Sequence, residues 1–146
     1  MMRCGELIQT LEMMKTHVQR IAPDAHLSEA VDLMDLYQVR SLPVVDSEGS
    51  LIGILSERDI LTAIFAEAEA LERNSFSSWA RAGERLVCDL MTSPVVSVHE
   101  TEEVHGALLL MFQHELNRIP VLTEQNRVIG ILNRVDVLQA LFEGTL

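Results

Sequence analysis

The sequence predicts a mixed α/β protein of the α+β type, built from two copies of one βαββα unit. The main observation is an internal repeat at a constant separation of 77 positions, which runs without a gap from Met14 to Ala66. The residues that repeat include Pro43 with Pro120, Gly53 with Gly130, and Asp59 with Asp136. A repeat this long indicates two supersecondary units that bury their apolar faces against each other. We therefore expect function where loops related by the repeat face one another.

The composition supports one compact globule. At 146 residues, of which 48% are hydrophobic, the chain is long enough to bury a substantial core. Aromatic residues make up only 4%, which predicts an aliphatic core whose gaps are filled by the seven methionines. We expect an amino-terminal helix over residues 1–13, a first repeat over 14–66, a helical linker over 67–89 and a second repeat over 90–146.

The charge argues against two classes of partner. With a net charge of −11, the chain lacks the basic face that a nucleic acid or an anionic membrane surface requires. A small anion could still bind, because helix N-termini and local arginines can override the global field. Two cysteines, Cys4 and Cys88, make no disulfide framework and fit a reducing compartment. No apolar run approaches the roughly 18 residues of a membrane span and nothing resembles a secretory signal, so we expect a cytoplasmic protein.

Apolar periodicity places the elements of the first half of a copy. Residues 18–21 form an extended piece, Ser28 and Glu29 open a helix, and residues 42–45 form a strand whose Pro43 indicates a strand start or a sheet edge. The apolar side of the helix is expected to comprise Ala30, Val31, Leu33, Met34 and Tyr37. Before this copy, the stripe of Leu7, Ile8, Leu11 and Met14 predicts that the amino-terminal helix packs on the core or on a second subunit.

The second half of a copy is predicted to be a hairpin followed by a helix. Residues 46–49 are typical of a hairpin turn, and the apolar strand at 51–55 predicts burial on both faces. A helix begins at Ser56, continues past Ala66 and is broken at 74–75, before a short helix capped within 77–79. The second copy repeats this order, with elements expected at 95–98, 102–114, 119–122 and 128–132, a turn at 124–126 and a final helix from Asn133.

The most specific local motif is a glycine, a short polar residue and an aspartate at intervals of three. It occurs as Gly53, Ser56 and Asp59, and again as Gly130, Asn133 and Asp136. The glycine predicts that another backbone or a ligand approaches the strand closely. A helix that begins at the polar residue offers free N–H groups to a phosphate, and the aspartate can accept hydrogen bonds from two ribose hydroxyls. The alternative is a purely structural capping box, with Asp in place of the usual Glu, and a capped helix start can still bind an anion.

These motifs together resemble the CBS domain, named after cystathionine β-synthase. The resemblance rests on the repeated Pro-Val strand, the turn, the apolar-Gly-apolar strand and the Ser-x-x-Asp motif, and it spans roughly residues 13–142. Two such repeats in tandem resemble a Bateman module, here with no room for an attached enzyme or transporter domain. The resemblance implies that the copies pack through their sheets about a pseudo-twofold axis. It also implies two clefts that bind AMP, ADP or ATP, with NAD or S-adenosylmethionine as less favoured ligands, and no required cofactor.

The resemblance also implies roles for individual residues. Ser56 would contact phosphate and Asp59 ribose in the favoured site, and Asp136 would hold ribose in the other, where Asn133 departs from the usual Ser or Thr. Adenine would lie among backbone and apolar groups of the extended segment and the proline strand of each copy. These groups are Val18, Ile21, Leu42 and Pro43 in one copy and Val95, Val98, Ile119 and Pro120 in the other. Candidate phosphate cations are Arg40, Arg58, Arg118 and Arg134; the alternative is that they pair with Glu57, Glu29 or Glu115 at the surface.

Three classes of function follow. The favoured hypothesis is a regulatory module that binds an adenine nucleotide and signals to an effector protein, and we expect it to form a homodimer. The second is a scaffold or interaction module whose clefts are vestigial. The third is an enzyme, for which the sequence offers no nucleophile–base pair, carboxylate dyad or P-loop. The five histidines lack metal-site spacing, so no metal site is predicted.

Overall fold

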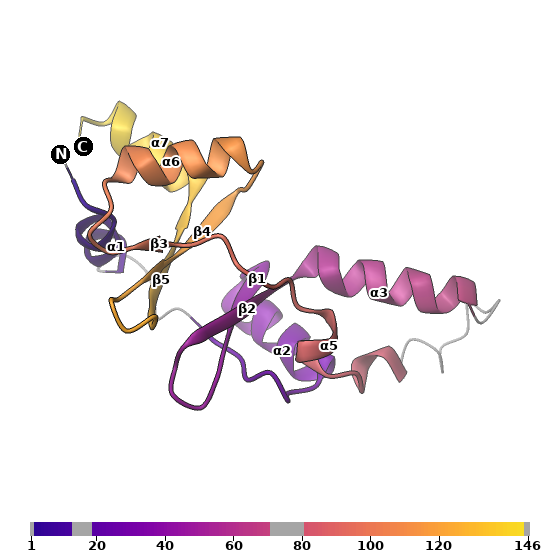
Figure 1. Ribbon diagram of the computed structural model, residues 1–146. Helices are drawn as coiled ribbons and strands as arrows, with labels where there is room; N and C mark the ends of the chain where they lie inside the picture. Colours follow the sequence, from indigo (N-terminus) through magenta and orange to yellow (C-terminus); the bar gives the residue numbers. More distant parts are fainter. Residues whose placement is uncertain (1, 13–18, 71–80, 145–146) are drawn as a thin grey trace. The chain divides into compact units, whose positions relative to one another are not determined.

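A computed structural model describes residues 2–12, 19–70 and 81–144 (Figure 1). The chain divides into two compact units, which we describe one at a time. The central unit is Gln19–Val95, and the terminal unit combines Met1–Val18 with Val96–Leu146. Among the described residues, no helix is both long and apolar enough to cross a membrane. The expected helix break at 74–75 and the expected cap at 77–79 lie outside the described residues, as does Val18.

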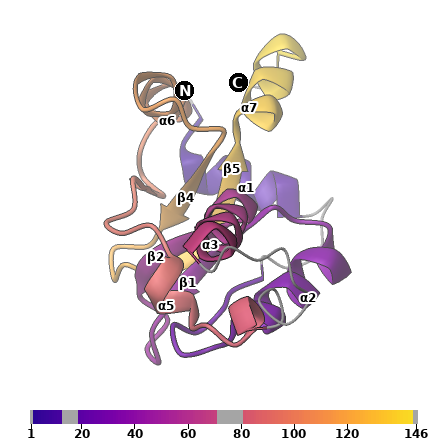
Figure 2. The same cartoon turned by 90° about the vertical axis from the view of Figure 1, so that its right-hand side faces the viewer.

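The described part of the central unit is built on a hairpin flanked by helices. Its elements are α2 (Leu27–Tyr37), β1 (Ser41–Val45), β2 (Leu51–Ser56), α3 (Glu57–Ala70) and α5 (Val87–Leu90). The expected turn joins β1 to β2, where Asp46 Oδ1 accepts hydrogen bonds from the N–H groups of Glu48 and Ser50 at 2.9 and 3.0 Å. Gly49 allows this turn because its φ is 84°. Figures 1 and 2 show α3 running away from the end of β2.

The core of the central unit differs from the sequence prediction in two ways. On α2 the buried stripe is narrower than expected: Ala30 and Met34 are buried, but Val31 and Tyr37 are 46% and 40% exposed. Val31 lies at the edge of the stripe and Tyr37 is the last residue of the helix. The prediction that β2 is buried on both faces was also wrong. Gly53 and Leu55 are buried while their neighbours are only half-buried, because alternate side chains point to opposite faces of a strand.

The terminal unit carries a three-stranded sheet. Its elements are α1 (Cys4–Glu12), β3 (Val98–His99), α6 (Val104–Gln113), β4 (Arg118–Leu122), β5 (Val128–Asn133) and α7 (Arg134–Phe142). The strand order is β3-β4-β5, with β3 parallel and β5 antiparallel to β4. Helices α6 and α7 lie side by side (Figure 1). Helix α1 packs on the core, one of the two alternatives expected for it, because Cys4, Leu7 and Ile8 are buried with residues of β4, β5 and α6.

The two hairpins have the same register, as the constant repeat predicts. Pro43 stands opposite Ile54 and Pro120 opposite Ile131, and both hairpins have an irregularity one residue further on. Pro43 lies inside β1 and not at its start, but β1 is an edge strand of the two-stranded sheet, which was the other alternative that the sequence offered. The parallel neighbour explains why it is tolerated. Ile21 donates to the Pro43 carbonyl at 3.1 Å and accepts from the Val45 N–H at 3.0 Å, so this ladder skips the proline nitrogen.

Candidate nucleotide-binding site

The first copy of the motif forms a reciprocal cap where β2 passes directly into α3. The Asp59 N–H donates to Ser56 Oγ at 3.1 Å, and the Ser56 N–H donates to Asp59 Oδ2 at 2.9 Å. Both side chains are half-buried. The Glu57 N–H donates to the Arg40 carbonyl at 2.9 Å, so the first turn of α3 is tied to the residue before β1. The capping box that the sequence allowed is therefore present, and it fixes the Asp59 carboxylate at the end of a strand.

A third residue reaches Asp59 from far along the chain. Thr92 Oγ1 donates to Asp59 Oδ1 at 3.3 Å, while the Thr92 backbone pairs with Ile54 beside β2. The close approach predicted at Gly53 is this segment: a Cβ at Gly53 would collide with the Met91 side chain and lie 3.2 Å from the Thr92 carbonyl oxygen. Thr92 was not among the predicted site residues, because its segment belongs by sequence to the second repeat. The glycine was the signal that something had to lie there.

The second copy of the motif is built differently. Asn133 precedes α7 and its side chain makes no hydrogen bond to the helix backbone. Instead, Asn133 Nδ2 donates to Asp136 Oδ2 at 3.1 Å. The capping box that the sequence allowed in this copy therefore lacks the bond that Ser56 makes, because Asn133 occupies the N-cap position without a hydrogen bond from its side chain to the helix backbone. The Arg134 N–H donates to the Asn117 carbonyl at 2.8 Å, which repeats the bond between Glu57 and Arg40.

The four candidate phosphate cations surround the two motifs along the chain. Arg40 and Arg58 are exposed, whereas Arg118 and Arg134 are half-buried. Arg58 and Arg134 lie in the first turns of α3 and α7, and Arg118 stands opposite Asn133 in the hairpin ladder. These placements leave their role as phosphate ligands a prediction.

Most of the residues predicted to contact adenine are buried in the cores of the two units. Within the central unit, Ile21, Leu42 and Pro43 are buried, and so are Val98, Ile119 and Pro120 within the terminal unit. Val95 is half-buried. A buried side chain cannot contact an adenine base, so any contact from these segments would come from their backbone. Their binding role also stays a prediction.

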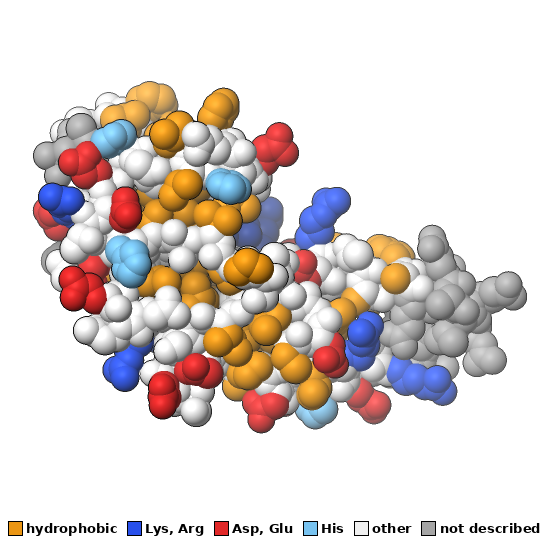
Figure 3. All heavy atoms as spheres, viewed as in Figure 1, with side chains coloured by type: hydrophobic (Ala, Val, Ile, Leu, Met, Phe, Trp, Pro, Cys, Tyr) orange, Lys and Arg blue, Asp and Glu red, His pale blue; other side chains and the backbone are white. Residues whose placement is uncertain are grey.

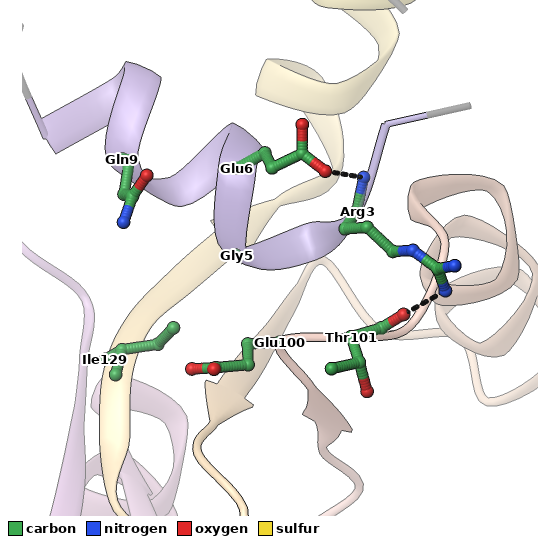
Figure 4. Close-up of a pocket in the computed structure, with 7 residues that line it drawn as sticks. All are labelled: Arg3, Gly5, Glu6, Gln9, Glu100, Thr101 and Ile129. Atoms are coloured by element: carbon green, nitrogen blue, oxygen red, sulfur yellow. Dashed lines mark hydrogen bonds between the residues drawn. The ribbon is translucent and has the colours of Figure 1, made fainter.

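Two shallow hollows lie away from the motifs. One, of about 460 Å³, is in the terminal unit and is lined by Arg3, Gly5, Glu6, Gln9, Glu100, Thr101 and Ile129. Figure 4 shows the Arg3 guanidinium on the Thr101 carbonyl and the side chains of Glu100 and Ile129 extending toward one another. The other, of about 410 Å³, lies around residues 20–24 and 45–47 of the central unit. Its one β1 residue, Val45, is at the turn end of the hairpin, opposite the end that carries Ser56.

Other reactive side chains offer little chemistry. Cys4 is fully buried, and burial, helped by the nearby Glu102 carboxylate, raises the pKa of its thiol to about 11. A thiol of this kind stays protonated and is a poor nucleophile. His105 Nδ1 lies 3.2 Å from Glu103 Oε2. Within the described ranges, no three His, Cys, Asp or Glu side chains cluster as a metal site would require.

Comparison with known proteins identifies the family. The family model described as the CBS domain matches residues 9–66 and 87–143, which is most of the sequence. The chain belongs to the CBS domain family. It carries two CBS domains in tandem, and the expectation of a CBS pair is confirmed. The mixed helices and small sheets of each unit agree with the α+β fold of CBS-pair structures.

Two relatives show how much of a known protein this chain matches. The CBS pair is 33% identical over 128 residues to inosine-5'-monophosphate dehydrogenase of Methanocaldococcus jannaschii, covering 88% of this chain but 22% of that enzyme. It is 31% identical over 126 residues to the CBS domain-containing protein YhcV of Bacillus subtilis, covering 86% of this chain and 80% of YhcV. Because the chain spans less than a quarter of the dehydrogenase, that enzyme's activity does not transfer with the alignment.

Solved structures agree on the fold. CBSX2 in complex with AMP superposes with a TM-score of 0.77 at 24% identity, covering all of both chains. The CBS domain of a CBS domain-containing membrane protein from Sphaerobacter thermophilus gives 0.74 at 26% identity, over 94% of this chain and 86% of that one. The CBS pair described here therefore has the architecture of its family.

Proposed function

We propose that this CBS pair is a regulatory module that binds an adenosine-containing nucleotide, with Asp59 as the ribose ligand. The observation that carries the proposal is the Asp59 carboxylate, which the Ser56 N–H holds at 2.9 Å at the junction of β2 and α3. A carboxylate fixed in one orientation accepts two neighbouring hydroxyls without first losing side-chain entropy. Asp59 is only half-buried, so a ligand can reach it.

The neighbours of Asp59 supply phosphate chemistry. Ser56 Oγ accepts from the Asp59 N–H, and its own O–H proton can still be donated to a phosphate oxygen. The start of α3 adds the positive end of a helix dipole, and the exposed Arg58 side chain supplies a cation in the same turn. These groups match the anionic part of AMP, ADP or ATP.

The ligand class is supported by one relative and by chemistry. CBSX2, a structural neighbour, is described in complex with AMP. AMP, ADP and ATP carry the ribose that Asp59 can recognise and a terminal phosphate that Ser56 and Arg58 can recognise. NAD has the same adenosine and a diphosphate but no terminal phosphate, and S-adenosylmethionine has the adenosyl group without any phosphate. We therefore favour the mononucleotides and keep the other two as alternatives to be tested.

A second site would lie at Asp136 in the terminal unit. Its neighbour Asn133 directs an amide N–H to Asp136 Oδ2, so that N–H is not offered to a phosphate. We infer weaker binding of phosphorylated ligands there than at Asp59. Binding at either site would be signalled to an effector protein.

A ligand-free scaffold is the second candidate function. It is favoured by the reciprocal cap itself, because Ser56 and Asp59 already satisfy each other without a ligand. It is also favoured by exposed apolar side chains such as Phe112 and Phe142, which are 76% and 82% exposed. Figure 3 shows hydrophobic side chains at the surface of the terminal unit, where a partner or a second copy could bind.

A binding panel separates the two functions. Protein shown to be free of bound nucleotide is titrated with AMP, ADP, ATP, NAD and S-adenosylmethionine, and its melting temperature is measured in parallel. Ligand at 100 times its Kd should add about 2.7 kcal/mol of stability, which corresponds to roughly 5–10 °C in the melting temperature. Loss of this shift in Asp59→Ala, with retention in Asp136→Ala, is the expected result. No binding to any of the five would leave the scaffold.

A further inference from the structure

The two oxygens of the Asp59 carboxylate are held from two different parts of the central unit. Oδ2 accepts from the Ser56 N–H at 2.9 Å, and Oδ1 accepts from Thr92 Oγ1 at 3.3 Å. An ionised carboxylate has about four lone-pair sites, two on each oxygen. These two donors therefore use one site on each oxygen. The remaining site on each oxygen points away from them.

Thr92 is itself held by the sheet. It exchanges two backbone hydrogen bonds with Ile54, one of 3.0 Å from the Ile54 N–H and one of 2.8 Å to the Ile54 carbonyl. The next residue adds a further contact, since Ser93 Oγ donates to the Ile52 carbonyl at 3.0 Å. The preceding residue, Met91, lies over Gly53. Backbone pairing with Ile54 thus fixes the position from which the Thr92 side chain extends to Asp59.

We propose that Thr92 is a positioning residue for the ribose site. The Ser56 N–H holds Oδ2 and the Thr92 hydroxyl holds Oδ1, so together they restrict rotation of the Asp59 carboxylate about its Cβ–Cγ bond. The carboxylate then presents one lone pair from each oxygen, which is the arrangement that accepts two adjacent hydroxyls of a ribose. This inference rests on the proposed function and deepens it, because it makes the ribose diol the group that the site recognises.

Thr92 also places the site under the influence of a distant segment. Along the sequence it lies 33 residues after Asp59, within the second CBS match at 87–143, yet the central unit contains it. The chain leaves this unit just after Val95. Any change that draws the segment Met91–Ser93 away from β2 removes the Thr92 donor, and the affinity for ribose falls with it.

The test compares Thr92→Val with Thr92→Ser by calorimetric titration. Valine keeps the branched shape and strand propensity but loses the hydroxyl, whereas serine keeps the hydroxyl. All measurements are made in an Asp136→Ala background so that only the Asp59 site is titrated, and the probes are AMP and 2′-deoxy-AMP. Melting temperatures without ligand show whether each variant is folded.

The expected result is specific to the diol. Thr92→Val should bind AMP about threefold to tenfold more weakly, and its preference for AMP over 2′-deoxy-AMP should shrink by the same factor. Thr92→Ser should retain both values. Equal loss in Thr92→Ser, or an unchanged AMP preference in Thr92→Val, would overturn the role of Thr92 while leaving Asp59 as a site. Failure of the background protein to bind AMP, or binding that Asp59→Ala does not alter, would instead overturn the proposed function and the Thr92 role together.

Discussion

Ile54 and Thr92 exchange two backbone hydrogen bonds, of 3.0 and 2.8 Å, although 37 residues of chain separate them. The pairing extends the edge of β2 with a segment that belongs by sequence to the second CBS match. The central unit therefore ends at Val95, whereas the first repeat was predicted to end at residue 66. Repetition in sequence and continuity of packing are separate properties in this protein.

The two equivalent glycines should tolerate a methyl group differently. In the terminal unit, a Cβ at Gly130 would lie 2.7 Å from Ile8 Cδ1 and 2.8 Å from Ile8 Cγ2, both on one side chain of α1. Gly130→Ala should therefore lower the free energy of unfolding by about 1–3 kcal/mol. Adding Ile8→Ala should lessen the cost of the glycine substitution, which denaturant unfolding of the single and double variants would measure. Additive losses would contradict this contact.

At Gly53 the obstacle includes backbone. A new Cβ there meets the Met91 side chain and lies 3.2 Å from the Thr92 carbonyl oxygen, which accepts the Ile54 N–H. Gly53→Ala should cost as much as Gly130→Ala or more, and Met91→Ala should restore less of the loss than Ile8→Ala does at Gly130. A complete rescue by Met91→Ala would show that the strand edge moves freely.

The two motif copies should respond unequally to loss of the polar residue. Ser56→Ala removes an acceptor for the Asp59 N–H at the start of α3, so it should cost about 1 kcal/mol of stability. Asn133→Ala removes a bond to Asp136 but no helix cap, and should cost less. Asn133→Ser would install the hydroxyl and is expected to stabilise the protein relative to Asn133→Ala. Chemical denaturation of all three variants measures these differences, and equal costs at both positions would contradict the asymmetry.

The sequence predicted those features that depend on local pattern. The hairpins, their turns and their register follow from residues that repeat at 77 positions, and Pro43 and Pro120 accordingly occupy the same register position. The capping relation of Ser56 and Asp59 also needs only residues three apart. Such contacts can be predicted from spacing because residues three apart at a helix start are always close in space.

Features that depend on tertiary choice were missed. Thr92 meets Asp59 only because its backbone pairs with Ile54 in an isolated bridge, and no local pattern encodes that partner. Asn133 is as good a cap as Ser56 by propensity, yet its Nδ2 donates to Asp136, since an amide side chain can reach the carboxylate three residues further on. Val31 satisfies the apolar period but lies 46% exposed, because period alone does not set the width of a buried stripe.

Stability should fall at alkaline pH through Cys4. Its thiol is fully buried, and burial raises its pKa from 9.0 to about 11 in the folded state. Between these values the folded state binds more protons than the unfolded state, so the free energy of unfolding decreases as pH rises from about 9 to about 11. Below pH 9 this group has no effect.

The check is denaturant unfolding at several alkaline pH values, with Cys4→Ala as the control. The variant should lose part of the decrease, because alanine does not titrate. Alkylation gives an independent reading: exposed Cys88 should react in the folded protein and buried Cys4 only after unfolding. Rapid alkylation of Cys4 in the folded protein would refute the assignment.

Self-association should depend on α6 and α7. Phe112 and Phe142 are 76% and 82% exposed, and Leu109 and Val135 on the same two helices are 53% and 68% exposed. Large apolar side chains in this number are uncommon on a surface that meets only water. The net charge of −11 opposes contact between two copies, and α6 itself contains no acidic residue, so repulsion is lowest there.

We therefore expect a homodimer that Phe112→Glu together with Phe142→Glu converts to a monomer, as measured by sedimentation. Gln125→Glu adds a negative charge at an exposed turn position and serves as the control that should stay dimeric. A wild-type species of 16.4 kDa that is insensitive to dilution would contradict the dimer.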